Sequence, residues 1–466
     1  MNINTKNNLY LFGIHAVLSY ISIYSPYIGM AWGVAIVAIG IYKTLKTRNQ
    51  NNEAALFAAY FMSLEVVLRI NKGSLSYEMG KYGVIILLLT GLFFEKRPHF
   101  LPRQFLTFII VLLPAIFLVE MGDIELERKA ILFNLSGPFT LAVSAIYFYN
   151  RKFTKQDVYN ILLYIMLPAF SLGILLFFKT PDLSEIKFNT VSNSSLSGGF
   201  GPNQVSTMLG LGIFVGIFAF LMGLSLTGSK IVDLFIILFL TLRGLLTFSR
   251  GGVVAAILGL AAAIFFIMKY RQDAKLLKQI VIGGFLICIA GIGVWSYTNA
   301  LTGGTLALRY QGKSMNDPNK VNFTAGRLEI IETELEAFSA YPILGTGVGM
   351  GRLFRIERGE EGLAAHTEYT RLLGEHGIYG FLALLILLIS PLVHLFKVNK
   401  DTKPFLAGFI VVSLFTMFHA AMRLAMPGFI YGLAFISLII DDQPDPETPT
   451  FPTYNPPEKR KLQDVF

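Results

Sequence analysis

The sequence predicts an all-α protein that crosses a membrane many times, as a helical bundle of about 12–14 transmembrane helices with one large outer loop containing amphipathic helices. Three observations predict this fold class. Hydrophobic residues make up 54% of the 466 positions, and charged residues only 15%. Apolar runs long enough to cross a hydrocarbon core of ~30 Å recur along the whole chain. The connections between these runs alternate between basic and neutral or acidic composition, which is typical of polytopic membrane proteins.

The apolar runs number about fourteen, and several are short enough to form half of a hairpin. The first run, near Leu9, lacks a small-residue cleavage site and is followed at once by a second, so we expect a retained span. The predicted spans are 8–24, 27–42, 53–69, 81–94, 104–119, 130–149, 158–178, 204–226, 231–247, 251–268, 279–296, 377–396, 404–422 and 427–440.

Lysine and arginine mark alternate connections, and the positive-inside rule assigns these connections to the cytoplasm. Most of the others are neutral or acidic and are assigned to the outer side, with Lys72 and Lys81 as mild exceptions. An even number of spans then places both termini in the cytoplasm. The basic residues that indicate this topology are Lys43, Lys46, Arg48, Lys96, Arg97, Arg103, Arg151, Lys152, Lys155, Lys269, Arg271, Lys275, Lys278, Lys397, Lys400 and Lys403.

This topology divides the chain into four regions. We expect an N-terminal transmembrane bundle over 1–296 and an outer loop with the catalytic elements over 297–376. C-terminal transmembrane helices follow over 377–440. The proline-rich segment 441–466 is expected to be a disordered cytoplasmic tail.

Composition also narrows the class of function. The net charge of +9 is spread over short connections, so it indicates orientation in a bilayer and gives no sign of nucleic-acid binding. Cys288 is the single cysteine, which excludes an intramolecular disulfide and a cysteine cluster for a metal. We expect Cys288 to be a small buried hydrophobic residue. The outer connections carry no D-x-D motif or histidine cluster, so neither a metal nor a cofactor is predicted.

Three outer connections are more than simple turns. The segment Thr180–Pro202 is irregular and leads into Asn203, which we expect to cap the following helix. The turn Ser249–Gly252 sets Arg250 at the outer membrane boundary. The segment Tyr297–His376 has about eighty residues, far more than an ordinary connection, which indicates a functional loop.

The long loop contains one predicted helix and one glycine-rich segment. Thr324 is expected to cap an amphipathic helix that carries Arg327 in its first turn and an apolar stripe from Leu328 to Phe338, as in a helix on a membrane surface. The helix breaks at Tyr341-Pro342, and I-L-G-T-G-V-G-M-G follows. Backbone N–H groups of such a turn could cradle phosphate, but it lacks the lysine and strand–helix order of a nucleotide loop, so simple loop flexibility is the alternative.

Topology assigns Arg250, Arg327 and His366 to the same outer boundary. Two arginines could hold a pyrophosphate without a metal, because guanidinium groups bind phosphate bidentately. A neutral histidine with a pKa near ~6.5 could accept a proton from a sugar hydroxyl. Structural alternatives exist for all three: a snorkelling charge for Arg250, an ion pair along its own helix for Arg327, and an interfacial residue that satisfies the next helix for His366.

Four residues form a second tier of site candidates. Arg243 lies about two turns below Arg250 and either lines the same cavity or bonds local carbonyls. His419 and Arg423 are four residues apart near the outer end of the penultimate span. Asn203, at the start of a span, completes this set.

Two other positions receive structural interpretations. Glu65 and Arg69 are four residues apart on one helix and are expected to neutralise each other. His376, ten residues beyond His366, is expected at the start of the following span.

Five motifs, in this order, resemble those of the O-antigen ligase and polymerase superfamily of bacterial integral-membrane glycosyltransferases. Each motif alone is unspecific, whereas their order and spacing around one outer loop make the resemblance strong over roughly residues 180–425. The motifs are G-P-N-Q at Gly201–Gln204, S-R-G-G at Ser249–Gly252, T-A-G-R-L-E-I-I at Thr324–Ile331, Y-P-I-L-G-T-G-V-G at Tyr341–Gly349 and A-H-T-E-Y-T-R-L-L-G-E-H-G-I-Y-G at Ala365–Gly380.

The resemblance implies a metal-independent enzyme of the bacterial inner (cytoplasmic) membrane, with the large loop and the active site on the periplasmic face. It would move a glycan from undecaprenyl pyrophosphate to lipid A-core or another glycan acceptor. Arg250 and Arg327 would bind the donor pyrophosphate, and His366 would activate the acceptor hydroxyl, with inversion at the anomeric carbon. The sequence departs from the family pattern at Thr367, where asparagine or serine is more usual, and it has more predicted spans than the usual twelve.

Two alternative functions stay open. A polymerase of the same superfamily would join repeat units on the lipid carrier. A flippase or another transporter of lipid-linked glycans would need inward and outward access and often has repeated halves, whereas this chain concentrates its polar residues in one outer loop.

Overall fold

The computed structural model describes residues 8–96, 101–182, 186–270, 273–314, 327–359 and 365–439. These residues are almost entirely helical, with one pair of two-residue strands, so the predicted all-α fold class is confirmed. Each apolar run predicted as a span contains a helix. The predicted tail 441–466 and the predicted cap Thr324 lie outside the described residues.

The elements follow one another along the chain with short connections, except around the outer loop. The first half contains α1 (Leu9–Ile21), α2 (Pro26–Thr47), α3 (Glu53–Ile70), α4 (Met79–Phe94), α5 (Arg103–Leu112), the 3-10 helix η1 (Pro114–Leu118), α6 (Ile124–Phe148), β1 (Lys152–Phe153), α7 (Lys155–Lys179), η3 (Ser195–Ser197) and α8 (Pro202–Leu221). The second half contains α9 (Lys230–Leu246), α10 (Arg250–Tyr270), α11 (Ala274–Leu301), α12 (Thr305–Tyr310), α13 (Arg327–Ala340), α14 (Gly351–Glu357), α15 (Glu368–Lys397), α16 (Lys403–Ala420), α17 (Ala425–Leu433) and β2 (Ser437–Leu438).

Eight helices of the described ranges are long and apolar enough to cross a membrane: α2, α6, α7, α8, α10, α11, α15 and α16. The helices α1 and α4, and the segment Arg103–Leu118, are apolar but shorter. The chain is therefore a multi-pass membrane protein. The prediction of a last span over 427–440 is wrong. The helix found there, α17, has nine residues, whereas crossing the bilayer takes about 20. The chain turns after α17 and pairs β2 with β1 in parallel.

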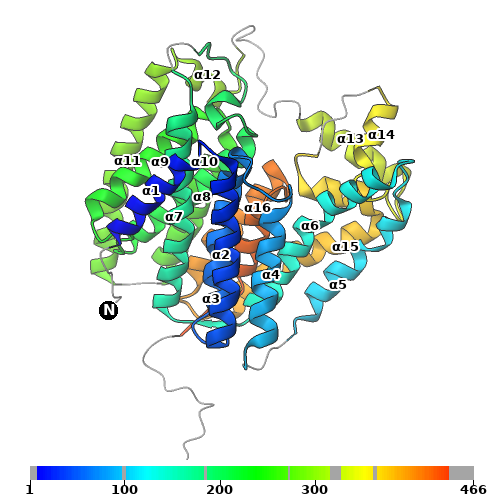
Figure 1. Cartoon of the computed structure of the whole chain (residues 1–466), viewed down its shortest axis with the longest axis horizontal. Helices are drawn as coiled ribbons and strands as arrows, with labels where there is room; N and C mark the ends of the chain where they lie inside the picture. The colour runs from blue at the N-terminus through cyan, green and yellow to red at the C-terminus, as the bar shows by residue number, and fades with distance from the viewer. Residues whose placement is uncertain are drawn as a thin grey trace, which may run out of the picture.

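Two large hydrophobic clusters hold most of the helices together. The larger cluster joins α1–α4 and α7–α10 and includes residues of α6, and the smaller one joins α5, α6 and α15. Helices α16 and α17 contribute to both clusters, because α16 packs along α10 and α17 packs along α6. Figure 1 shows the resulting arrangement, with α7–α11 on one side, α5, α6 and α15 on the other, and α16 between them.

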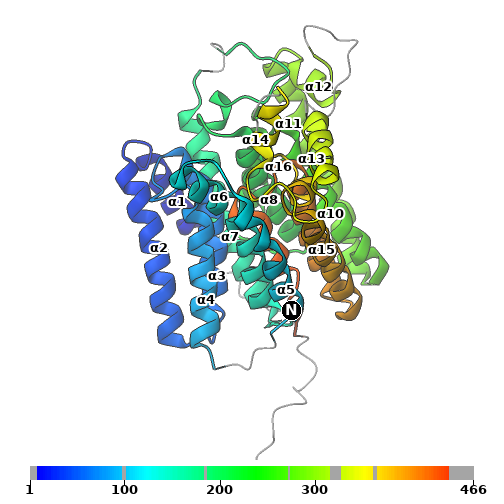
Figure 2. The ribbon, with the colours of Figure 1, turned by 90° about the vertical axis from the view of Figure 1, so that its right-hand side faces the viewer.

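The connections gather at two opposite ends of the bundle. At one end, Arg151 forms an ion pair of 2.6 Å with Glu95, and its carbonyl oxygen accepts a hydrogen bond from the Ser437 amide. This end unites connections that the sequence analysis assigns to the cytoplasm. The short helices α12, α13 and α14 lie at the opposite end, the upper one in Figures 1 and 2.

Helix α11 is the least enclosed of the long helices. Of the residues in its most apolar 18-residue stretch, only 11% are buried, compared with 89% in the corresponding stretch of α8. Its side-by-side partners are α9 and, over fewer residues, α8. The prediction that Cys288 is buried is wrong, since the side chain lies on the exposed surface of this helix. Its apolar environment would be lipid.

Candidate functional site

The N-terminal ends of α8 and α10 touch through glycine. A Cβ atom on Gly252 would lie 1.8 Å from the carbonyl oxygen of Ser206, and one on Gly251 would lie 1.7 Å from Cδ2 of His419. Only hydrogen fits at either position. The S-R-G-G turn therefore presses α10 against α8 and the His419 imidazole, and it places Arg250 as the first residue of α10.

Asn203 lies in the first turn of α8 and does not cap it. The helix begins at Pro202 after Gly201, with no side-chain capping bond, so the capping prediction is wrong. Proline suits this first position because its φ is already helical and its missing N–H is not needed there. The side-chain oxygen of Asn203 instead accepts a hydrogen bond of 2.8 Å from the Ser249 hydroxyl. Asn203 thus ties α8 to the S-R-G-G turn.

Arg309, on α12, is a cation that the sequence analysis missed. Its Nε donates to the carbonyl oxygen of Phe248 at 3.0 Å, and its Nη1 donates to that of Thr190 at 3.0 Å. Nη1 of Arg250 in turn donates to the carbonyl oxygen of Arg309 at 3.1 Å. Phe248 has a φ of 54°, in the left-handed region that non-glycine residues rarely adopt. Arg309 therefore holds a strained turn directly before Arg250.

Arg327 is the first described residue of α13, and the helix predicted from its amphipathic pattern is present. Ile330, Thr333, Glu334 and Ala337 form its buried face, which packs on α15. The predicted apolar stripe lies on the other side, where Leu328 is 50% exposed and Leu335 is 42% exposed. Such a face suits a membrane surface.

The glycine-rich segment after α13 is a docking loop, and its backbone does not form a phosphate cradle. The amide of Gly347 donates to the carbonyl oxygen of Glu375 at 3.1 Å, that of Thr346 to Gly374 at 2.9 Å, and that of Val348 to Ala115 at 3.2 Å. These N–H groups already have partners within the protein. Simple flexibility is also the wrong description, because the loop fixes α13 and α14 on α15.

A kink in α15 accepts this loop. Gly377 has φ 59° and ψ −135° within the helix. A Cβ atom there would lie 2.6 Å from the carbonyl oxygen of Ile343, so the position requires glycine. The neighbouring His376 is fully buried inside α15, which begins eight residues earlier, at Glu368.

His366 lies two residues before α15. Thr367 is the N-cap of this helix, and its hydroxyl accepts a hydrogen bond from the Tyr369 amide at 3.3 Å. Serine and asparagine are equally good N-cap residues. The departure from the family pattern at Thr367 therefore preserves the cap that orients the backbone next to His366.

Arg423 lies in the turn between α16 and α17, and this turn is held from two sides. Glu65 accepts a hydrogen bond of 2.7 Å from the Ala425 amide, and Glu368 accepts one of 3.1 Å from the Met422 amide. A guanidinium N–H of Arg423 donates to the carbonyl oxygen of Ala365, the residue before His366. The buried turn thus places a cation directly beside the histidine.

The expected pairing of Glu65 with Arg69 is confirmed by an ion pair of 2.6 Å. Arg69 also donates to the carbonyl oxygen of Arg423 at 3.3 Å. The turn itself is strained, since Ala421 has φ 52° and ψ −161°, a conformation that only glycine adopts without cost.

The remaining second-tier candidates, His419 and Arg243, occupy different places. Nε2 of His419 lies 3.4 Å from the Thr207 hydroxyl, and Nδ1 lies 3.2 Å from the carbonyl oxygen of Phe415. Arg243 bonds local acceptors at the end of α7, the carbonyl oxygen of Leu176 and the hydroxyl of Thr180. It does not line the cavity described next.

The described residues Arg309, Arg327 and His366 line one cavity of about 480 Å³, which we call the arginine cavity. Arg250 is attached to it through its hydrogen bond to Arg309. The lining that the structure describes contains no carboxylate. It comprises Thr190, Val191, Ser192, Asn203, Arg309, Gly312, Lys313, Ser314, Arg327 and His366.

The charges around this cavity act strongly on one another. Burial and the guanidinium groups of Arg423, Arg327 and Arg355 lower the pKa of His366 to about 4. Burial, together with the charges of Arg250 and Arg327, lowers the pKa of Arg309 to about 10. At neutral pH the imidazole is therefore uncharged and the guanidinium groups stay charged. A group of crowded cations favours binding of a multiply charged anion.

His366 has a further property that suits chemistry. Its Nδ1 is buried and has no hydrogen-bond partner among the described residues. An unsatisfied buried nitrogen costs free energy. A substrate hydroxyl or phosphate oxygen would relieve this cost.

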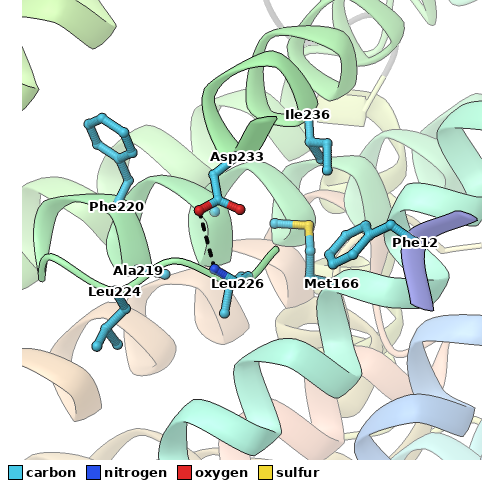
Figure 3. Close-up of a pocket in the computed structure, with 9 residues that line it drawn as sticks. Phe12, Met166, Ala219, Phe220, Leu224, Leu226, Asp233 and Ile236 are labelled. Carbon is cyan, nitrogen blue, oxygen red and sulfur yellow. Dashed lines mark hydrogen bonds between the residues drawn. The ribbon is translucent and has the colours of Figure 1, made fainter. Parts of the chain in front are cut away.

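A buried carboxylate elsewhere has a structural explanation. Asp233 accepts hydrogen bonds from the Ser225 hydroxyl at 2.6 Å and from the Leu226 and Thr227 amides at 3.2 and 2.9 Å. The adjacent cavity, shown in Figure 3, has a volume of about 10 Å³, room for about one water molecule. Asp233 thus holds the connection between α8 and α9. Within the described ranges, no three histidine, cysteine, aspartate or glutamate side chains form a group that could hold a metal ion.

A comparison with protein families supplies the identification. Residues 234–385 match the family described as O-antigen ligase. This part of the chain is similar to the O-antigen ligase family. The resemblance to the O-antigen ligase and polymerase superfamily is thereby confirmed, and the match indicates a ligase-like or polymerase-like function. No curated protein matches the chain closely enough to add to this.

The matched segment 234–385 contains most of the residues of the candidate site. It extends from α9 to the middle of α15 and includes Arg250, Arg309, Arg327 and His366. Asn203, His419 and Arg423 lie outside the matched residues but contact or surround the same site.

Proposed function

We propose that this chain transfers a glycan from undecaprenyl pyrophosphate to an acceptor, lipid A-core or a similar glycan, on the periplasmic face of the bacterial inner membrane. One observation carries the proposal: Arg309, Arg327 and an uncharged His366 line one cavity whose described lining has no carboxylate. Pyrophosphate is the anionic part of such a donor, and it needs cations both for binding and as a leaving group.

Arg250 and Arg327 are assigned to the donor pyrophosphate, and Arg309 joins them on the grounds of its position. Guanidinium groups form bidentate, charge-assisted hydrogen bonds to phosphate oxygens. The N-termini of α8 and α10 add partial positive charge at the same end of the bundle. These cations are in place before the substrate arrives, so they stabilise the developing charge without reorganisation.

His366 is assigned as the general base. The acceptor hydroxyl oxygen forms a bond to the anomeric carbon, and the bond from that carbon to the phosphate oxygen breaks. The pyrophosphate leaves with the electron pair, and the hydroxyl proton moves to the imidazole. A bound pyrophosphate offsets the charges that lower the histidine pKa. The base thus becomes stronger when the donor is present.

The orientation of the protein in the membrane follows from its charges. The end with Lys46, Arg151 and Lys400 is assigned to the cytoplasm by the positive-inside rule, and the end with the arginine cavity to the periplasm. Both termini would then be cytoplasmic, and the region 297–376 would supply most of the catalytic elements.

The test is transfer by purified protein from a defined undecaprenyl-pyrophosphate glycan to lipid A-core. Single changes of Arg250, Arg327 or His366 to alanine should each lower the rate by at least about 100-fold. Arg358→Ala is the matched control, because Arg358 is an exposed arginine paired with Glu336 away from the cavity. A fully active His366→Ala variant would overturn the assignment of the base.

The products distinguish a ligase from a polymerase. A ligase gives glycan attached to lipid A-core, whereas a polymerase gives longer lipid-linked chains and leaves lipid A-core unmodified. Movement of the donor across vesicles without any bond formation would instead indicate a transporter.

A further inference from the structure

Glu334 is a buried carboxylate that takes no direct part in the proposed transfer reaction. It lies on the buried face of α13, and its side chain is 4% exposed. Its Oε2 accepts a hydrogen bond of 2.5 Å from the hydroxyl of Thr370, in the first turn of α15. Burial of a carboxylate without a partner is costly. Glu334 therefore belongs to the structure that joins the two helices.

The second partner of Glu334 is on a third element. Nη1 of Arg355, on α14, lies 3.5 Å from Oε1 of Glu334, and the Arg355 side chain is 3% exposed. The charges of Arg371 and Glu375 on α15 also act on this carboxylate, but these two residues pair with each other at 2.7 Å. Glu334 thus binds α15 through one oxygen and α14 through the other.

The main chains of α13 and α15 meet at the same residue. A Cβ atom on Gly374 would lie 2.9 Å from the carbonyl oxygen of Glu334, so glycine permits this close approach. From the contact, the Glu334 side chain extends toward the N-terminus of its own helix, as helical side chains do. It reaches Thr370, about one turn before Gly374 on α15. The N-terminal ends of both helices therefore lie on the same side of the contact.

These N-terminal ends carry two residues of the candidate site. Arg327 is the first described residue of α13, about two turns before Glu334 and on the same face. His366 comes two residues before α15. Both line the arginine cavity, and the charge of Arg327 acts on the imidazole. With the main chains already in contact, the hydrogen bond of Glu334 fixes the angle between the two helices. This angle sets the separation between Arg327 and His366.

We propose that Glu334 is a positioning residue that aligns the donor-binding Arg327 with the proposed base His366. The inference rests on the proposed transfer function. Transfer needs the pyrophosphate and the base aligned with one anomeric carbon, and an error of about 1 Å in such an alignment lowers a rate by about 100-fold. A carboxylate suits this role, because charge-assisted hydrogen bonds are shorter and stronger than neutral ones. Glu334 does not line the arginine cavity, so it acts through Arg327.

The decisive variant is Thr370→Val, because it removes the hydroxyl and leaves the pair of Glu334 with Arg355 intact. We expect kcat for transfer to fall by about 10-fold or more. The KM for the donor should change by less than about 3-fold, since Arg250 and Arg309 belong to α10 and α12 and still bind the pyrophosphate. Thr370→Ser should retain most of the activity, because serine keeps the hydroxyl. Rates are compared at about pH 8, because burial raises the pKa of Glu334 to about 7.

Changes of the carboxylate test the same bond from the other side. Glu334→Gln keeps an oxygen for the Thr370 hydroxyl, so combining it with Thr370→Val should lower kcat no further than Thr370→Val alone. Glu336→Gln is the matched control, because Glu336 lies on the same helix but is exposed and pairs with Arg358. Thr140→Val is the control for the hydroxyl, since it removes a buried hydroxyl that bonds within its own helix, α6. Both controls should keep the kcat of the wild type.

Amide hydrogen exchange in α13 measures the attachment of this helix without any transfer reaction. Thr370→Val should speed exchange in α13 by about 10-fold or more and leave exchange in α10 unchanged. Faster exchange in α13 together with the fall of kcat supports the positioning role. Unchanged exchange, unchanged kcat, an equal loss of kcat in Thr370→Ser, or faster exchange throughout the protein overturns it and leaves the transfer function standing. Wild-type protein that transfers no glycan overturns the proposed function, and the positioning role with it.

Discussion

At the scale of single residues, the candidate site combines one uncharged histidine, the proposed base, with several cations that oppose its protonation. Burial and three neighbouring guanidinium groups lower the pKa of His366 to about 4. Strong acid is therefore needed to protonate this proposed base when no donor is bound. In the proposed donor complex, the pyrophosphate would offset part of the charge of these guanidinium groups, and the pKa of His366 would rise.

The positive charges around His366 predict that kcat/KM and kcat for transfer fall at different pH values on the acidic side. The limb of kcat/KM, which reports the free enzyme, should fall near pH 4, where the histidine becomes protonated. The limb of kcat, which reports the donor complex, should fall at higher pH. Arg423→Gln should move the kcat/KM limb upward, because Arg423 lowers this pKa more than the other charged neighbours do.

Rates of purified protein measured from below pH 4 up to pH 8 check this prediction. Arg358→Gln is the control, since it removes an exposed arginine away from the histidine. An unchanged kcat/KM limb in Arg423→Gln would contradict the assignment of the base.

The N-cap of α15 allows a second test. Thr367→Asn should retain activity, because asparagine also caps a helix. Thr367→Val keeps the shape but loses the capping oxygen, which should lower the free energy of unfolding by about 1 kcal/mol and also lower kcat. Thermal unfolding and initial rates measure the two effects. Equal kcat for all three proteins would show that the cap does not orient His366.

At the scale of elements, glycine decides how the helices bring the site together. Gly252 allows α10 to meet α8, and Gly377 allows α15 to accept the loop after α13. In each case a Cβ atom would meet a backbone carbonyl oxygen, which cannot move as a side chain can. The site therefore depends on close contacts between main chains at least as much as on its charged side chains.

Gly252→Ala should destabilise the protein by at least about 1–3 kcal/mol, since the added carbon must displace α8 or α10. Gly284→Ala in α11 is the control, because nothing lies within 4 Å of its Cβ position. The control should be neutral or slightly stabilising, because alanine is the better helix former. Thermal unfolding in detergent compares the two variants, and equal shifts would contradict the contact between α8 and α10.

The helices were predictable because apolar runs of bilayer length leave few alternatives. The motifs also identified the turns and loops that contribute to the candidate site. Their backbone roles were not predictable: the glycines after α13 dock on α15, and Asn203 bonds Ser249 and caps nothing. Both outcomes depend on partners more than 25 residues away in sequence. Arg309 was missed because it lies in none of the five motifs. A survey of every arginine in the outer loop would have included it.

At the scale of the whole molecule, α16 and α17 connect the two large hydrophobic clusters. The turn between these helices carries Arg423 and is held by Glu65 from one cluster and Glu368 from the other. The sequence predicted the pairing of Glu65 with Arg69, because four residues make one helical turn. It could not show that Glu65 also holds the turn, since Ala425 is 360 positions away.

Glu65→Ala should therefore lower the free energy of unfolding by about 3–5 kcal/mol, because it leaves Arg69 buried without its carboxylate. Glu65→Gln combined with Arg69→Met should recover much of the stability, since no uncompensated charge remains. Calorimetry in detergent measures both. If the double variant is as unstable as Glu65→Ala, the uncompensated charge of Arg69 is not the cause of the loss, because glutamine can still accept the hydrogen bond from the Ala425 amide.

The thin attachment of α11 has a consequence for how substrate reaches the site. Only 11% of the residues in the apolar 18-residue stretch of this helix are buried. The helix leads directly into α12, which carries Arg309. Among the long helices, it is the one whose displacement breaks the fewest protein contacts. Lipid tails that push α11 aside would carry Arg309 away from Phe248 and Arg250, so one motion would both admit the lipid chain of the proposed donor and take the site apart. On this view, the pyrophosphate is bound fully only after the helix returns.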